Sequence, residues 1–178
     1  MDTEANQKNF TSLKITFAIV LSIIILVVAQ LLSFSISELP LNVGVPPAIC
    51  NILSGVLYAV FAFIGAKLLC QRLLKISLNE LRIPRLKMKP IWIISAFAMP
   101  ALVLAIAMFL GGHWEITPLN AADRNATITG AIFFYGLATG IVEELIFRGI
   151  IMGCLEKRFN IRIAIIIPSV LFGLLHII

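Results

Sequence analysis

Five apolar runs separated by short polar segments set the pattern of this chain. They cover about residues 15–36, 46–69, 91–110, 128–155 and a last run that starts near 163. A helix of about 20 apolar residues crosses a hydrocarbon core of about 30 Å. Within lipid, a helix also satisfies its own backbone polar groups. The pattern therefore predicts an all-α fold, a polytopic transmembrane helix bundle of about five spans.

The composition supports a membrane environment. Apolar residues make up 60% of the 178 residues and charged residues 13%, whereas charged residues make up about a quarter of an ordinary soluble domain. The lipid bilayer is thus an expected partner. We expect a multi-pass integral protein of the cell membrane.

The positions of the basic residues indicate how the chain is oriented. The net charge of +5 could suggest nucleic acid as a partner. However, the lysines and arginines gather beside the spans, and six of them lie in the loop at residues 71–90. Because such loops stay on the cytoplasmic side, the N-terminal segment 1–14 and the 71–90 loop are predicted to be cytoplasmic, the loop as an amphipathic surface segment. No nucleic-acid partner is expected.

The three cysteines carry no recognisable pattern. Cys50, Cys70 and Cys154 lie in or next to apolar runs and show no paired spacing. A free cysteine in such a place behaves as a small hydrophobic residue. The sequence therefore predicts neither a disulfide framework nor a cysteine-rich zinc site.

The fourth apolar run contains three charged residues, Glu143, Glu144 and Arg148. Each would cost about 2.5 to 3.5 kcal/mol at the centre of a membrane helix, so they should face protein or a water-filled cavity. Glu144 and Arg148 are four residues apart and are expected to form an ion pair. Glu143 has Phe147 at that spacing, so its partner must be water or another helix. Glu143 is therefore the carboxylate available as a general base.

The last apolar run contains one histidine, His176. A hairpin through residues 157–162 would bring it back past Glu143, at depths that agree to about one helical turn. Contact between the two side chains is predicted. Gly136 and Gly140 are also spaced four residues apart, which predicts a close approach between helices at these glycines.

The sequence EExxFRG at residues 143–149, followed by FxxxH at 172–176, resembles the first two motifs of the CPBP family. These membrane proteases include type II CAAX prenyl endopeptidases and bacterial bacteriocin-immunity relatives. The resemblance covers about the last 50 residues. It implies that residues 128–178 are part of a protease core. The apolar pattern predicts three preceding spans within residues 15–127, around the 71–90 loop.

The resemblance also implies an intramembrane endopeptidase acting on a peptide or protein substrate at a site open to the cytoplasm. Glu143 would activate the attacking water, and His176 would help to bind that water or a metal. The residues that would orient the site or pack beside it are Glu144, Phe147, Arg148 and Phe172.

The cofactor stays open at this point. The family is classed with the metalloproteases by analogy, and a metal-free glutamate mechanism has also been argued for it. Catalytic zinc takes three protein ligands and keeps an open position, and this cluster offers at most Glu143, Glu144 and His176. A divalent metal such as zinc, held by Glu143 and His176, is one alternative.

The family's pattern continues into a later motif, a His followed four residues on by Asn or Asp, whereas this sequence ends at Ile178. The sequence thus suggests a C-terminally truncated form, an inactive fragment being one alternative. Others are a non-catalytic bacteriocin self-immunity or membrane binding protein, and a small transporter or proton relay. The oligomeric state is not indicated.

Overall fold

The structure, a computed structural model, describes residues 11–76, 90–111 and 118–177. All regular elements in these ranges are helices, which confirms the all-α prediction. The elements are α2 (Ser12–Asn42), α3 (Pro47–Leu68), η1 (Leu69–Leu74), α4 (Pro90–Gly111), α5 (Ala121–Thr129), η3 (Gly130–Ala138), α6 (Thr139–Glu143), η4 (Glu144–Met152), α7 (Gly153–Glu156) and α8 (Ile161–Leu175).

The chain divides into two compact units. One comprises Met1–Ile83 and Ala121–Ile178, and the other, Pro84–Asn120, contains α4. Most of the predicted 71–90 loop lies outside the described residues. The site described below belongs entirely to the first unit.

Three helices are long and apolar enough to cross a membrane: Ser12–Asn42, Pro47–Leu74 and Ala121–Glu156. The apolar helices Ala101–Gly111 and Ile161–Leu175 are shorter. The 15 residues of α8 extend about 22 Å, less than a hydrocarbon core of about 30 Å. The structure thus supports a helical membrane bundle, while the count of five spans and the cytoplasmic N-terminus stay predictions.

Local sequence explains where these helices begin and end. The Thr11 hydroxyl accepts a hydrogen bond from Lys14 N at the start of α2, and Asn160 caps α8 by accepting from Ile163 N at 3.0 Å. The second span runs through η1 to Leu74, past its predicted end at residue 69, and closes where Lys75 adopts a φ of 54°. Residues 71–74 therefore belong to the second span and not to the predicted loop.

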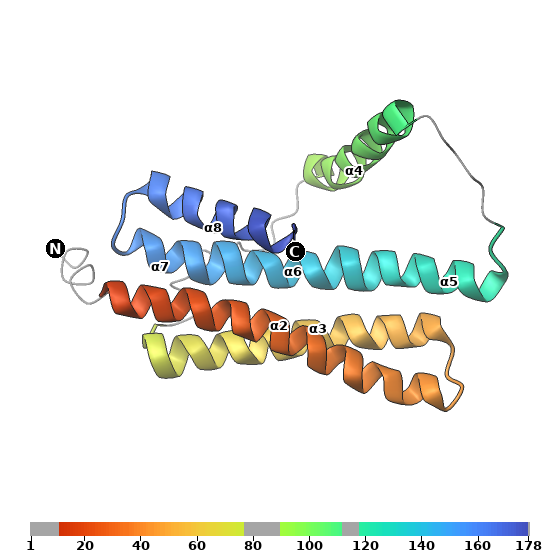
Figure 1. Ribbon diagram of the computed structural model, residues 1–178, viewed down its shortest axis with the longest axis horizontal. Coiled ribbons are helices and arrows are strands. Elements are labelled where there is room, and N and C mark those ends of the chain that lie inside the picture. The colour runs from red at the N-terminus through yellow and green to blue at the C-terminus, as the bar shows by residue number, and fades with distance from the viewer. Residues whose placement is uncertain (1–10, 77–89, 112–117, 178) are drawn as a thin grey trace. The chain divides into compact units, whose positions relative to one another are not determined.

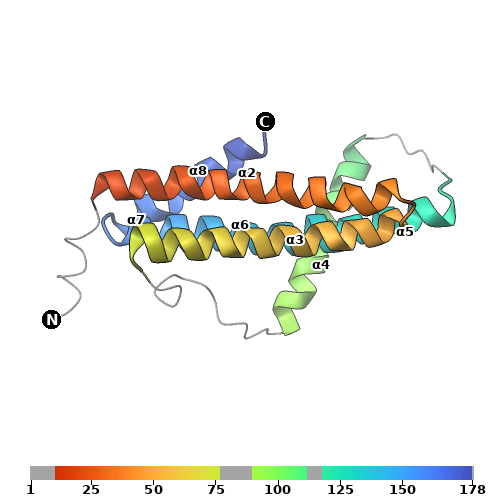
Figure 2. The same cartoon turned by 90° about the horizontal axis from the view of Figure 1, so that it is seen from below.

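The helices α2, α3 and the fourth span, α5 to α7, lie side by side (Figures 1 and 2). Small residues allow this packing. A Cβ atom at Gly65 would lie 2.7 Å from Cγ2 of Ile25 in α2, and one at Gly55 would lie 2.7 Å from the Phe133 carbonyl oxygen of the fourth span. Small residues at such contacts let membrane helices approach closely.

The prediction that Gly136 and Gly140 provide the close approach was wrong. Apart from the adjoining backbone of its own helix, no described atom lies within 4 Å of a Cβ placed at Gly140, and at Gly136 the one such neighbour among the described residues is the Ala131 carbonyl oxygen of the same helix. Neither glycine thus makes a close contact with another described helix. The close contacts occur instead at Gly55, where α3 meets the fourth span, and at Gly65, where α3 meets α2.

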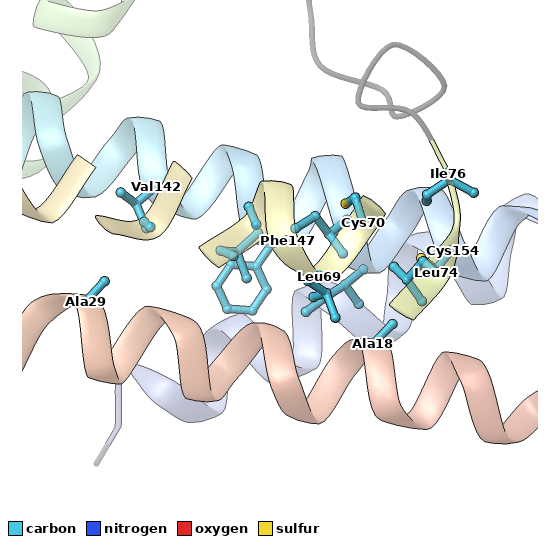
Figure 3. Packing of buried hydrophobic residues seen from close by; sticks show 14 of the residues in the cluster. Ala18, Ala29, Leu69, Cys70, Leu74, Ile76, Val142, Phe147 and Cys154 are labelled. Carbon is cyan, nitrogen blue, oxygen red and sulfur yellow. The ribbon is translucent and has the colours of Figure 1, made fainter. Parts of the chain in front are cut away.

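The buried core includes residues of η1, α7 and α2. Figure 3 shows Cys70 and Leu74 of η1 near Cys154 of α7, with Ala18 of α2 facing them. All three cysteines of the chain are buried free thiols, as the sequence indicated. They act here as small core residues.

The fourth span is continuous from Ala121 to Glu156, but two of its segments, η3 and η4, have the wider turns of a π-helix. The Thr139 hydroxyl donates to the carbonyl of Phe134, five residues earlier, at 3.0 Å. Such wide turns are uncommon and often occur at functional sites. In this chain, η4 begins at Glu144, within the charged motif.

Candidate active site

The Glu143 and His176 side chains meet at the edge of the bundle. Oε1 of Glu143, the last residue of α6, lies 3.4 Å from Nε2 of His176. This confirms the predicted contact, which the turn from α7 to the Asn160-capped α8 makes possible. His176 follows the last residue of α8 instead of lying inside the helix.

A second contact determines which nitrogen of His176 carries a proton. Its Nδ1 atom lies 2.9 Å from the carbonyl oxygen of Phe172. Because a carbonyl oxygen only accepts, Nδ1 must be the donor. In neutral histidine, Nε2 is then an acceptor that faces another acceptor, the Glu143 carboxylate. Two acceptors can lie this close when Nε2 and Oε1 share a proton, or when both accept from the same donor. The pair is therefore suited to proton transfer.

Two aromatic rings support the histidine. The Phe172 ring lies 4.3 Å from the His176 ring, centroid to centroid, and meets Phe147 edge to face at 5.3 Å. Phe147 is buried, and its side chain points from η4 toward α2 (Figure 3). Both phenylalanines thus occupy the positions expected beside the site. They connect His176 to the hydrophobic core.

Glu144 and Arg148 form the predicted ion pair, with Nε of Arg148 3.4 Å from Oε1 of Glu144. Their side chains are 49% and 71% exposed, whereas that of Glu143 is 22% exposed. Within the described part of the chain, Glu143 is therefore the one member of the charged motif that is turned largely into protein. Arg148 neutralises Glu144 and leaves Glu143 without a cation on its own helix.

One buried polar residue near the fourth span was not predicted from the sequence. Tyr58 of α3 is 2% exposed, and its ring stacks on Phe134 of the fourth span, with centroids 5.6 Å apart. An aromatic residue in an apolar run is typical of a core position. The sequence does show that Tyr58 is the one polar side chain between Ser54 and Lys67 in this span.

The described residues of the site supply few donors for a metal ion. Among residues 11–76, 90–111 and 118–177, no group of three His, Cys, Asp or Glu side chains could hold a metal ion. Glu143 and His176 supply two donors, and Glu144 is paired with Arg148. The described donor set does not fit a catalytic zinc, which takes three protein ligands.

Comparisons with known proteins concern the same part of the chain. Residues 125–178 match the family model described as Type II CAAX prenyl endopeptidase Rce1-like. Searches of curated proteins and of solved structures found no significant match.

The fold and the site together define a helical membrane protein with a glutamate and histidine pair on adjacent helices. The match over its C-terminal segment, residues 125–178, supports membership of the CPBP family, which the EExxFRG and FxxxH motifs indicated. At the level of the family, this supports a CAAX-protease type of function.

Proposed function

We propose that this chain is an intramembrane endopeptidase of the CPBP type, in which Glu143 activates water to attack a peptide bond. The contact of 3.4 Å between Oε1 of Glu143 and Nε2 of His176 carries the proposal. The family match over residues 125–178 supports it. The protein would cross the cell membrane several times, with residues 128–178 forming part of the protease core and the site open to the cytoplasm.

The pair would act on a water molecule beside it. With Nδ1 donating to the Phe172 carbonyl, Nε2 of neutral His176 accepts one hydrogen of the water and the Glu143 carboxylate accepts the other. The water oxygen then bonds to the carbonyl carbon of the peptide while Glu143 takes a proton. Glu143 passes this proton to the amide nitrogen as the bond between carbon and nitrogen breaks.

The neighbouring residues would keep these two groups in place. Arg148 pairs with Glu144, so Glu143 is not drawn into an ion pair on its own helix. Phe172 holds the imidazole through its carbonyl and its ring. Phe147 anchors Phe172 to the core. In this proposal, Glu143 and His176 carry out the chemistry and these neighbours hold them in place.

The full chain reconstituted in liposomes, with a mixture of quenched fluorescent peptides as substrate, tests this proposal. Removing a general base typically lowers the rate by about 100-fold or more, so Glu143→Gln should abolish most cleavage. Glu38→Gln is the matched control, because Glu38 lies in α2, outside the site. Cleavage that survives Glu143→Gln, or a wild-type chain that cleaves none of the peptides, would contradict the proposal.

The same variant separates hydrolysis from a binding role. A bacteriocin self-immunity or membrane binding protein of this fold would still protect cells after Glu143→Gln, because the carboxamide keeps the size of the side chain. Loss of peptide cleavage together with retained protection would assign the protective role to binding. Loss of both would assign it to the proposed chemistry.

A further inference from the structure

Basic side chains gather at one end of the first unit. The start of α2, the end of η1 and the turn from α7 to α8 all lie at this end (Figures 1 and 2). Contacts between α2 and η1, between α2 and α7 and between α7 and α8 place these segments side by side. The described lysines and arginines of this basic end are Lys14, Arg72, Lys75, Lys157, Arg158 and Arg162.

Negative charge is scarce at the basic end. In the described residues 11–18, 69–76 and 154–164, which form it, Glu156 is the one acidic residue against six basic ones. At the opposite end of the unit, the described charged residues are Glu38, Asp123 and Arg124. The basic end therefore attracts anions, whereas the opposite end does not.

The positive charges lie at the ends of the apolar helices. Lys14 directly precedes the buried Ile15, and Lys75 directly follows the buried Leu74. Each of these helices is apolar enough to cross a membrane. Basic residues next to such a helix lie close to the lipid headgroups.

The turn from α7 to α8 combines charge with exposed apolar side chains. Phe159 is 37% exposed, and its ring centroid lies 6.0 Å from Cζ of Arg158. The next apolar residue, Ile161, is 48% exposed. Aromatic residues that are apolar on one side and near charge on the other are enriched at the boundary between lipid and water. This composition fits the headgroup level of a bilayer.

The charge of Arg162 is not explained by the helix that carries it. Arg72 lies in the last turn of η1, and Lys157 follows the last residue of the fourth span. The helix dipole favours a cation at those positions. Arg162, in contrast, lies in the first turn of α8, where no acidic residue accompanies it. A cation at the start of a helix is unfavourable there unless an anion lies beside it.

We propose that the basic end binds the headgroups of anionic phospholipids in the leaflet that borders it. The phosphate oxygens of a headgroup accept charge-assisted hydrogen bonds from guanidinium and ammonium groups. The acyl chains would lie against exposed apolar side chains such as Phe17 of α2 and Ile165 of α8, which are 49% and 48% exposed. This surface is separate from the candidate active site, because Glu143 precedes Lys157 by about 21 Å of helix.

The full chain in lipid nanodiscs tests this binding without any assay of proteolysis. The midpoint of thermal unfolding should be several degrees higher in phosphatidylcholine mixed with phosphatidylglycerol than in phosphatidylcholine alone. High salt should reduce the difference, because it screens exposed charges. Inorganic phosphate should not reproduce it in phosphatidylcholine alone. A full rise with inorganic phosphate, or no rise with phosphatidylglycerol, would overturn the proposal.

Arg162→Gln and Arg124→Gln form a matched pair, because each replaces an exposed arginine near the start of a helix, at opposite ends of the unit. Arg162→Gln should reduce the gain from phosphatidylglycerol without lowering the midpoint in phosphatidylcholine alone. Arg124→Gln should keep the full gain. The triple variant with Arg72→Gln, Lys75→Gln and Arg162→Gln should lose most of it. A triple variant that gains as much as the wild type would overturn the proposal.

A second measurement does not depend on stability. Mass spectrometry of the lipids that co-purify from mixed vesicles should show phosphatidylglycerol enriched over its share in the vesicle. One basic residue near the surface changes the affinity for an anionic headgroup by about fivefold. The enrichment should therefore fall in Arg162→Gln and stay unchanged in Arg124→Gln. A wild-type chain that retains both lipids in the proportion of the vesicle would overturn the proposal.

Discussion

The Phe172 ring lies between those of Phe147 and His176, 5.3 Å from the first and 4.3 Å from the second. It thus connects a buried core residue to an exposed histidine. The position of His176, and with it the contact to Glu143, depends on this connection as well as on the hydrogen bond from Nδ1 to the Phe172 carbonyl.

Phe172→Leu should therefore weaken both the fold and the site. An aromatic pair contributes about 0.5 to 1.5 kcal/mol beyond its buried area, so the free energy of unfolding in detergent should fall by about 1 kcal/mol. Peptide cleavage should fall further, because the imidazole loses its support. Phe63→Leu is the control, since Phe63 is an exposed residue of α3. Equal effects of the two substitutions would contradict this role for Phe172.

The ion pair of Glu144 and Arg148 predicts an order among three variants. Arg148→Leu and Glu144→Leu each leave one charge in a membrane helix without its partner, so each variant should unfold more readily than the wild type. The double substitution removes both charges and should unfold less readily than either single variant. Unfolding by denaturant in micelles measures the order. If the two single effects simply add in the double variant, the pair does not contribute as a unit.

Two glycines predict opposite effects of the same substitution. Gly55→Ala would place Cβ 2.7 Å from the Phe133 carbonyl oxygen, a backbone atom that can move only with its helix. Overpacking of this kind costs about 1 to 3 kcal/mol. Gly140→Ala meets no described residue within 4 Å, and alanine gains up to about 1 kcal/mol over glycine in a helix. Thermal unfolding should separate them, and equal stability of both variants would contradict the helix packing described here.

The parts of the fold that depend on local sequence were predictable. The apolar runs predicted the helices, because lipid leaves few other ways to satisfy the backbone. The pair of Glu144 and Arg148 followed from spacing on one helix. Contact between Glu143 and His176 followed from the hairpin, because two adjacent helices joined by a short turn must match in depth.

The remaining features depend on contacts between distant segments. The spacing of Gly136 and Gly140 indicated a close approach but not the face on which a neighbour lies, so the close contacts at Gly55 and Gly65 were missed. The stacking of Tyr58 of α3 on Phe134 of the fourth span depends on tertiary packing alone. The π-helical turns of η3 and η4 likewise have no signature in the hydrophobic pattern.

In the proposed chemistry, Glu143 and His176 act as one reacting pair. A double-mutant cycle in kcat/KM, with Glu143→Gln, His176→Gln and the variant that carries both, tests it most directly. Groups that act as a unit lose their effect together, so the double variant should be no slower than the slower single variant. If the two losses multiply instead, the residues act independently, and the proposed shared activation of water is wrong.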